Sequence, residues 1–295
     1  MNPAKHVVVL GAAGGVGRLF IQFLGRQGHQ VFGVDAAAPR SEASHHQADI
    51  LAPSGDGALE HAFARADTII VALPDCVARA ALPWVAGHVR DEAVIVPTCS
   101  VQQPFFHDLA SIKPGHPCLG LNPMFSPSLP AQGRVVASCL PDPESTSHWL
   151  EQSVQEAGMR VKRLSPERHD QLMSVCQTLP HAAIIAFGLA LSDSGRLVDL
   201  DSVMEMAPPP MRAMLALLSR ILSNPAEVYW DIQSENPHGE LQRTALSDSL
   251  RQLSSMVEAK DGGAFSQELQ RTADRLGMHL ASGARDCQAM FSSLA

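Results

Sequence analysis

Five residues near the start of the chain have the types and spacing of a turn that binds a dinucleotide. They are Gly11, Gly14, Gly15, Val16 and Gly17, placed between an apolar run and an amphipathic helical pattern. In this context the first glycine makes a tight turn, another lets the backbone approach a pyrophosphate, and the last allows close helix packing. The helix N-terminus adds unpaired N–H groups for the phosphates. The stretch therefore predicts dinucleotide binding.

Asp35 predicts which dinucleotide is bound. It follows the second predicted strand, residues 30–34, where such domains place the carboxylate for the adenosine ribose hydroxyls. A carboxylate there repels a 2′-phosphate, so NAD is favoured over NADP. The nearby Arg40 keeps NADP open, and a solvated loop acid is the other interpretation of Asp35. Pro74 ends the strand predicted over 66–74 and should border the cofactor, because ligands lie at the carboxyl ends of parallel strands.

A second group of polar residues lies on one helical stripe, at intervals of four, three and four. These residues are Asp170, Ser174, Gln177 and His181. Apolar residues at helical spacing over 167–191 predict that this helix is buried, and Pro180 predicts a kink just before His181. A polar stripe in a core must face something polar, so Gln177 and His181 are candidates for substrate binding. A core histidine bonded to a neighbouring carbonyl is the alternative.

Two arginines lie in the apolar helical run 211–222. An arginine deep in such a run is costly unless it is paired, so we expect Arg220 to meet a carboxylate of the protein or of a substrate. Arg212 lies roughly 80° round the helix from Arg220. One of the two should therefore serve a site, and the other an interface or the surface.

Two loops follow predicted strands at the same edge of the sheet. Ser100 comes shortly after the strand predicted over 93–96, and Asn122 and Ser126 lie in a proline-punctuated loop after the strand predicted over 118–121. Their position makes them site candidates. A rigid connector is the alternative for the second loop.

The elements that position these residues divide the chain in two. Up to residue 165, buried strands alternate with helices; strands over 118–121 and 134–138 complete the predicted sheet, and 160–164 forms a last edge strand. From residue 166 the pattern is helical to the end, with two long helices from 241 onward broken at 261–263. The predicted fold is an α/β parallel-sheet domain over 1–165 followed by an all-α domain over 166–295.

Composition excludes several classes of function. A formal charge of −8 argues against a nucleic-acid partner, and the absence of 18 uninterrupted apolar residues argues against a membrane span. The start of the chain has no signal-peptide pattern, so we expect a cytoplasmic protein. The six cysteines are scattered without metal-binding spacing, which predicts free thiols and no metal site.

Several stretches, in order along nearly the whole chain, are similar to those of the prephenate dehydrogenase family. They are the glycine turn, Ser-Val at 100–101, Gly-Leu-Asn-Pro-Met-Phe at 120–125, Glu-Arg-His-Asp-Gln at 167–171, Leu-Pro-His at 179–181 and Ser-Arg-Ile-Leu-Ser-Asn-Pro at 219–225. The resemblance implies a Rossmann-type domain, an all-α dimerisation domain, a homodimer, NAD and a small substrate with two carboxylates. It also implies that the active site lies in the cleft between the domains. Ser100 would bond near the substrate ring oxygen, His181 would hold the substrate, and Arg220 would pair with its side-chain carboxylate.

Two residues depart from the family pattern. Asn122 stands where the family typically has the histidine of His-Pro-Met-Phe-Gly, and Gln102 stands where it usually has lysine. In the family that histidine accepts the proton of the C4 hydroxyl as hydride leaves, a general-base role worth typically 10²–10⁴-fold. Asparagine cannot titrate and can only hydrogen-bond.

The asparagine leaves three hypotheses open. In the first, the substrate is 4-amino-4-deoxyprephenate, whose amine lone pair expels hydride without prior deprotonation and gives 4-aminophenylpyruvate. The resemblance supports it, because aminated-substrate members of the family are expected to carry Asn in this loop. In the second, the protein is a prephenate or arogenate dehydrogenase that tolerates Asn122. In the third, it is a dinucleotide-binding sensor without catalysis, although intact Ser100, His181 and Arg220 argue against that.

Overall fold

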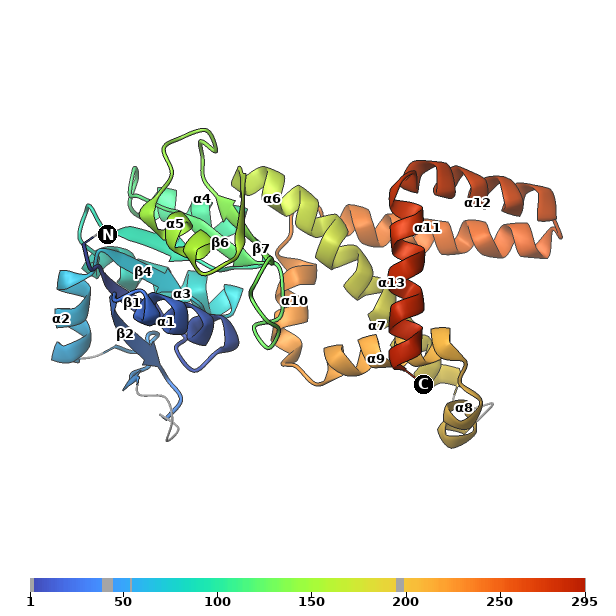
Figure 1. Ribbon diagram of the computed structural model, residues 1–295, viewed down its shortest axis with the longest axis horizontal. Coiled ribbons are helices and arrows are strands. Elements are labelled where there is room, and N and C mark those ends of the chain that lie inside the picture. The colour runs from blue at the N-terminus through green and yellow to red at the C-terminus, as the bar shows by residue number, and fades with distance from the viewer. Residues whose placement is uncertain (1–2, 39–44, 54, 195–198, 295) are drawn as a thin grey trace. The chain divides into compact units, whose positions relative to one another are not determined.

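The computed structural model describes residues 3–38, 45–53, 55–194 and 199–294 (Figure 1). The chain forms two compact units, one of Met1–Met173 with Ser234–Asn236 and one of Ser174–Gln233 with Pro237–Ala295. The first is α/β and the second is helical. The units divide at Met173, a little beyond the boundary that the sequence predicts at residue 165.

The first unit is built on a parallel five-stranded sheet in the order β3-β2-β1-β4-β5. Its strands are β1 His6–Leu10, β2 Gln30–Asp35, β3 His46–Gln47, β4 Thr68–Val71 and β5 Val94–Pro97. β4 is buried along its whole length, as expected for a β-branched strand covered on both faces. The short β3 has no counterpart among the predicted strands.

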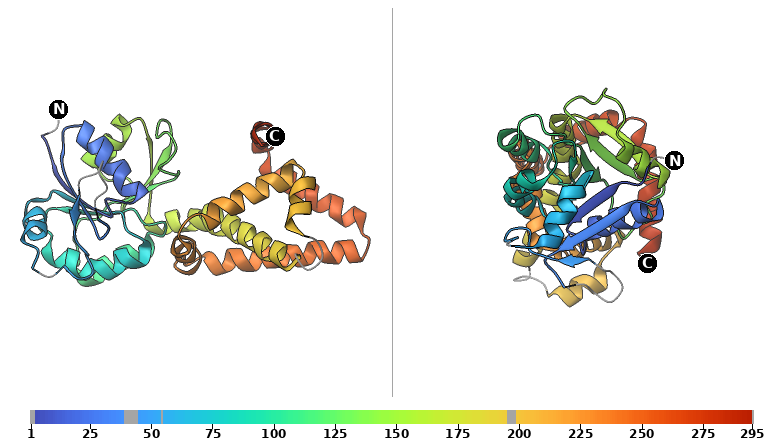
Figure 2. Two further views of the ribbon diagram at one scale, coloured as in Figure 1. Left: turned by 90° about the horizontal axis from the view of Figure 1, so that it is seen from below. Right: turned by 90° about the vertical axis from the view of Figure 1, so that its left-hand side faces the viewer.

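Helices cover both faces of this sheet. They are α1 Gly15–Arg26, α2 Gly57–Arg65, α3 Asp75–His88, α4 Gln103–Ile112 and α5 Trp149–Glu156, and the unit also contains α6 Pro166–Met173. One core joins α2, α3 and α4 to one face through residues such as Phe63, Leu82 and Phe105, and a second joins α1 and α5 to the other through Phe20 and Leu150. Figure 2 shows the blue α1 and the cyan α3 on opposite sides of the sheet. This is the doubly wound arrangement expected from alternating strands and helices.

A second, three-stranded sheet holds the strands that follow. It consists of β6 Gly120–Pro123, β7 Val135–Cys139 and β8 Arg160–Leu164, with β6 antiparallel and β8 parallel to β7. The prediction that all strands complete one sheet is therefore wrong. A single bridge, Ile95 with Cys118, links the two sheets. Pro97 lacks the N–H group that the next rung would need, which explains why this ladder stops.

The second unit is helical. It contains a π-helix, η1, over Ser174–Thr178, followed by α7 Leu179–Ser194, α8 Leu200–Met206, α9 Pro209–Leu222, α10 Ala226–Ser234, α11 Gly239–Glu258, α12 Gly262–Leu276 and α13 His279–Ser293. The last part of the chain thus forms three helices rather than the two predicted. Gly277, with φ of +51°, ends α12 and makes the break that the prediction missed.

The stretch around Pro180 differs from the buried helix that the sequence predicts. Pro180 cannot donate to the carbonyl of Cys176, and the irregularity takes the form of the π-helix just before it. Asp170, Ser174 and Thr178 are buried, whereas Val175 and Cys176 are exposed. None of the described residues of α7 is buried in the single chain. The wider turn shifts the register, so part of the predicted apolar face points to solvent.

All six cysteines are free thiols, as the sequence predicts. Cys99, Cys118 and Cys139 lie in or beside the sheets, where burial raises the pKa of each thiol above its ordinary value. Cys76 and Cys176 are exposed.

Candidate active site

The glycine turn between β1 and α1 has the geometry of a phosphate cradle. Gly11 has φ of +83°, and a Cβ there would lie 2.1 Å from the carbonyl oxygen of Ala72. A Cβ on Gly17 would lie 2.1 Å from the oxygen of Gly11. Gly14 precedes α1 and offers no side chain to cap it, so the first N–H groups of the helix are left for a ligand. The residues present therefore fit the pyrophosphate of a dinucleotide.

Two further predicted cofactor residues lie at the carboxyl ends of β2 and β4, the strands on either side of β1. The Asp35 carboxylate accepts hydrogen bonds from the N–H groups of Ala13 and Ala37, each at 2.9 Å. It is thereby fixed beside the glycine turn. Pro74 follows β4 and caps the start of α3. Arg40, the residue that keeps NADP open, lies outside the described residues.

Asn122 belongs to a buried hydrogen-bonded chain in the first unit. It lies on β6, and its amide Nδ2 is 3.1 Å from Nε2 of His169 on α6. His169 Nδ1 is 2.7 Å from the Asp170 carboxylate, and both of these side chains are completely buried. The same carboxylate accepts the N–H groups of Gln102 and Gln103, each at 2.8 Å. The chain thus ties β6 to the turn that follows β5.

That turn carries Ser100. Its N–H group and that of Val101 donate to Asp75, at 3.2 and 3.0 Å, so two aspartates hold the turn from its two ends. The first unit thus joins Ser100 and Asn122 to one network. Ser126 lies farther along the loop, where its hydroxyl is 2.8 Å from that of Ser128.

Gln102, the second departure from the family pattern, is buried inside the first unit. Its Nε2 donates to the Cys99 carbonyl at 2.7 Å. Its Oε1 lies only 2.1 Å from the position that a Cβ on Gly120 would take. The side chain therefore packs under β6, next to the strand that carries Asn122.

The second unit brings His181 and Arg220 together. The His181 ring meets Tyr229 edge-on, with 5.1 Å between ring centroids. Burial and the positive charge of Arg220 lower the pKa of His181, so the imidazole is neutral at neutral pH. Asn224 donates to the backbone oxygen of Arg220 at 2.6 Å and lies 3.4 Å from the Tyr229 hydroxyl.

Arg220 itself is exposed, which corrects the expectation that it lies deep in an apolar run. The apolar residues around it face other directions on α9. No carboxylate in the described part of the chain forms an ion pair with it.

Gln177 and His181 each present a buried polar atom without a partner among the described residues, Oε1 and Nδ1 respectively. Such groups are costly unless a ligand satisfies them. Arg212 is exposed and its Nε donates to the Ala207 carbonyl at 3.1 Å, which holds it at the start of α9. Arg212 is thus engaged at its own helix terminus, whereas Arg220 forms no ion pair with the described residues.

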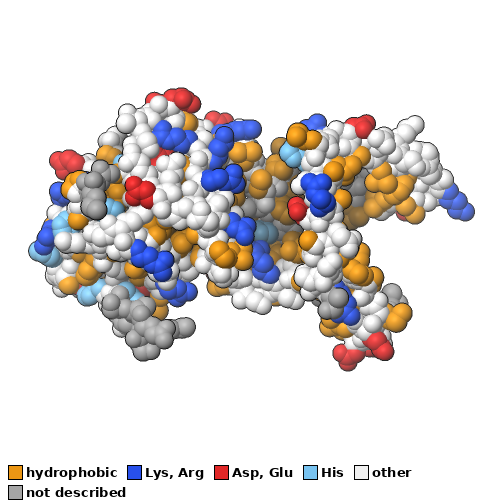
Figure 3. Space-filling view, viewed as in Figure 1, with side chains coloured by type: hydrophobic (Ala, Val, Ile, Leu, Met, Phe, Trp, Pro, Cys, Tyr) orange, Lys and Arg blue, Asp and Glu red, His pale blue; other side chains and the backbone are white. Residues whose placement is uncertain are grey.

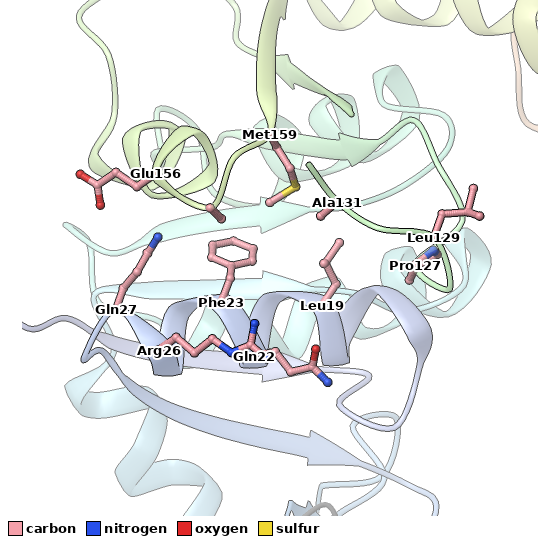
Figure 4. A pocket seen from close by; sticks show the side chains of 11 residues that line it. Leu19, Gln22, Phe23, Arg26, Gln27, Pro127, Leu129, Ala131, Glu156 and Met159 are labelled. Carbon is pink, nitrogen blue, oxygen red and sulfur yellow. The ribbon is translucent and has the colours of Figure 1, made fainter. Parts of the chain in front are cut away.

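A cavity of about 380 Å³ lies elsewhere in the first unit. Figure 4 shows Leu19 and Phe23 of α1 pointing toward Ala131 and Met159 across it. Its lining includes none of the predicted site residues. Among the residues that the structure describes, no cluster of three His, Cys, Asp or Glu side chains could hold a metal ion.

Reasoning from the sequence missed His169 as a site residue and placed Asp170 only on a polar stripe. A signal was present, because both stand in the stretch Glu-Arg-His-Asp-Gln that carries the family resemblance. What the sequence could not give was the partner of each side chain. Asp75 and Tyr229 were likewise not assigned to the site.

The first unit is of the Rossmann type, with an intact glycine turn and a carboxylate at the end of β2. The second unit is helical and carries Arg220 without an ion pair to the described residues. These features define the class of dinucleotide-dependent oxidoreductases. The family model described as "Prephenate dehydrogenase, dimerization domain" matches residues 165–271. The chain is 38% identical to the 4-amino-4-deoxyprephenate dehydrogenase of Streptomyces pristinaespiralis, over 97% of this chain and 96% of that protein. It belongs to the prephenate dehydrogenase family of NAD-dependent dehydrogenases.

Solved structures share the fold. Synechocystis arogenate dehydrogenase superposes with a TM-score of 0.68 at 18% identity, covering 93% of this chain and 99% of that one. The prephenate dehydrogenase of A. aeolicus, in complex with hydroxyphenyl propionate and NAD+, gives 0.65 at 19% identity and covers 92% of this chain and 98% of that one.

Proposed function

We propose that this protein oxidises and decarboxylates 4-amino-4-deoxyprephenate to 4-aminophenylpyruvate with NAD. One observation carries the choice of substrate. Asn122 replaces the family histidine, and its amide nitrogen is engaged by His169, so its oxygen remains as an acceptor. The name of the S. pristinaespiralis relative agrees with an amine at C4.

The chemistry explains why an asparagine is sufficient. Hydride leaves C4 with the electron pair of the C–H bond, and the ring carboxylate leaves as carbon dioxide. The electron pair of that broken C–C bond completes the aromatic ring, so no proton must be removed for the charges to balance. The amine lone pair stabilises the positive charge that develops at C4, whereas a hydroxyl does so well only with a base beside it. Bound NAD supplies the hydride acceptor.

The chain's residues divide this work. The Asn122 amide oxygen accepts an N–H of the C4 amine, and Ser100 contacts the ring nearby. Arg220 pairs with the side-chain carboxylate, while the neutral His181 and Gln177 offer the unpaired polar atoms described above. The glycine turn holds the cofactor phosphates, and the Asp35 carboxylate accepts hydrogen bonds from the ribose hydroxyls.

A parallel assay tests the substrate. NADH formation is followed by absorbance with 4-amino-4-deoxyprephenate and with prephenate, each with NAD and with NADP. We expect faster turnover of the amine and a preference for NAD. Equal kcat/KM for the two substrates would reject the amine assignment, and a preference for NADP would reject the role of Asp35.

We also infer a cytoplasmic homodimer formed through the helical unit. Leu250, Val257 and Leu269 on α11 and α12 are more than half exposed in the single chain, and Figure 3 shows orange side chains along these helices. The dimerisation domain of the family overlaps them. By length and composition Pro166–Asp193 would also pass as a membrane-crossing helix. Its Asp170 carboxylate is instead buried against backbone N–H groups, which supports a role inside a folded protein.

A further inference from the structure

His169 is a buried, titratable side chain that contacts Asn122 but is given no contact with the substrate in the function proposed above. Its ring lies between two side chains of the same unit, the Asp170 carboxylate at Nδ1 and the Asn122 amide at Nε2. Asp170 accepts N–H groups on both of its oxygens from Gln102 and Gln103. A carboxylate that receives such donors is an anchored acceptor, so the hydrogen at Nδ1 belongs to the histidine.

The tautomer of His169 follows from that anchor. With the hydrogen on Nδ1, the neutral ring has a lone pair on Nε2, and only a donor can approach it. The atom of Asn122 that faces it must therefore be the amide nitrogen, as the structure has it. The amide oxygen then lies on the other side of the group, and no described residue donates a hydrogen bond to it.

We propose that His169, oriented by Asp170, is a positioning residue that fixes the Asn122 amide with its oxygen toward the C4 substituent of the substrate. This inference rests on the proposed function and deepens it, because it explains how one asparagine becomes an acceptor only. An unrestrained amide could rotate and present its NH₂ group instead. That orientation would set N–H donors against the N–H donors of the amine and cost the hydrogen bond.

Side chains that hydrogen-bond to a metal-bound histidine orient its ring in a similar way. Removing such a side chain typically lowers activity or metal affinity by about 10–100-fold. We expect a change of similar size here. It should fall on kcat for the amine more than on KM, because the contact aligns the reacting carbon rather than anchoring the carboxylates.

The first test needs no substrate and uses the native protein. Long-range ¹H–¹⁵N NMR spectra identify the tautomer of each histidine, and the signal of His169 is assigned by its loss in His169→Gln. We expect a neutral ring with the hydrogen on Nδ1. A hydrogen on Nε2, or on both nitrogens, would overturn the proposal whichever substrate the enzyme takes.

The second test compares two variants. His169→Leu removes the acceptor, and His169→Gln can place an amide oxygen near the former position of Nε2. His169→Leu should lower kcat for 4-amino-4-deoxyprephenate by about tenfold or more and lower the ratio of amine to prephenate turnover, with NAD affinity unchanged. His169→Gln should recover part of both. His116→Leu, at a partly buried histidine of the same unit, is the matched control and should keep native kinetics.

The outcomes separate the inference from the proposed function. Native protein that turns over prephenate as well as the amine refutes the function, while the NMR result still decides the tautomer. Native protein that prefers the amine, with the same preference in a folded His169→Leu variant, refutes the inference alone. If His169→Leu does not fold, the tautomer measured in the native protein remains decisive.

Discussion

Asn122 is the residue on which substrate choice depends. Asn122→His should raise activity toward prephenate and lower it toward 4-amino-4-deoxyprephenate, because a base is restored for the hydroxyl. The site can hold such a base, since one nitrogen of a histidine at 122 can donate to Nε2 of His169 and leave the other as an acceptor. A site built for one hydrogen-bonding partner can reject its analogue by 10⁴–10⁵, and a single residue should move the ratio by about 10- to 100-fold.

Steady-state rates for both substrates, on both proteins at saturating NAD, measure this change. The native kcat should also show no ionisation near about 6.5, the ordinary histidine pKa. Asn122 does not titrate, and burial and Arg220 hold the pKa of His181 below that value. An unchanged substrate ratio in Asn122→His would refute the role of this residue.

Replacing Arg220 and replacing His181 by alanine should affect the kinetics to different extents. Arg220→Ala should raise KM steeply, because losing one partner of a charge-assisted pair costs about 2–5 kcal/mol. His181→Ala should cost less, since the neutral ring only positions the substrate. Arg251→Ala, which removes an exposed arginine of α11, is the control for charge alone. Equal, small effects for Arg220 and His181 would mean that the substrate carboxylate binds elsewhere.

At the scale of elements, the start of α1 packs closely on the turn that follows β1, whereas its far end is open. Replacing one glycine at each end of this helix by alanine should therefore change stability in opposite directions. Gly17→Ala places a Cβ 2.1 Å from the Gly11 oxygen and should destabilise the first unit by about 1–3 kcal/mol. Gly25→Ala meets no atom within 4 Å and should stabilise it by about 0.5–1 kcal/mol. Denaturant midpoints and NAD titration measure both. Similar shifts for the two variants would contradict the close packing of the turn.

The elements also show how far the sequence predicts the structure. The cofactor end is local: strand, glycine turn and carboxylate follow one another along the chain, and their order alone predicts the fold of β1, α1 and β2. The substrate end depends on distant partners. No residue near Asn122 in the sequence indicates that His169 is its partner. The end of the ladder at Pro97 likewise depends on a segment more than 20 residues farther along the chain. The π-helix was missed because the helical period was assumed constant through Pro180.

At the scale of the whole molecule, the exposed apolar residues of the helical unit predict assembly. Light scattering at low micromolar concentration should give twice the chain mass of 31.6 kDa. Burying Leu250, Val257 and Leu269 on a second copy removes the apolar surface that the single chain exposes. A monomer with full specific activity would contradict the dimer.

The buried thiols give the folded protein a built-in reporter. A thiolate, not a thiol, reacts with alkylating reagents, so the raised pKa values of Cys99, Cys118 and Cys139 protect them twice, by steric shielding and by protonation. The exposed Cys76 and Cys176 should be modified first. Cys287 of α13 is partly buried and should follow. Reagent taken up beyond these three cysteines then measures opening of the sheets, so labelling stoichiometry follows the integrity of the cofactor-binding unit while the enzyme is at work.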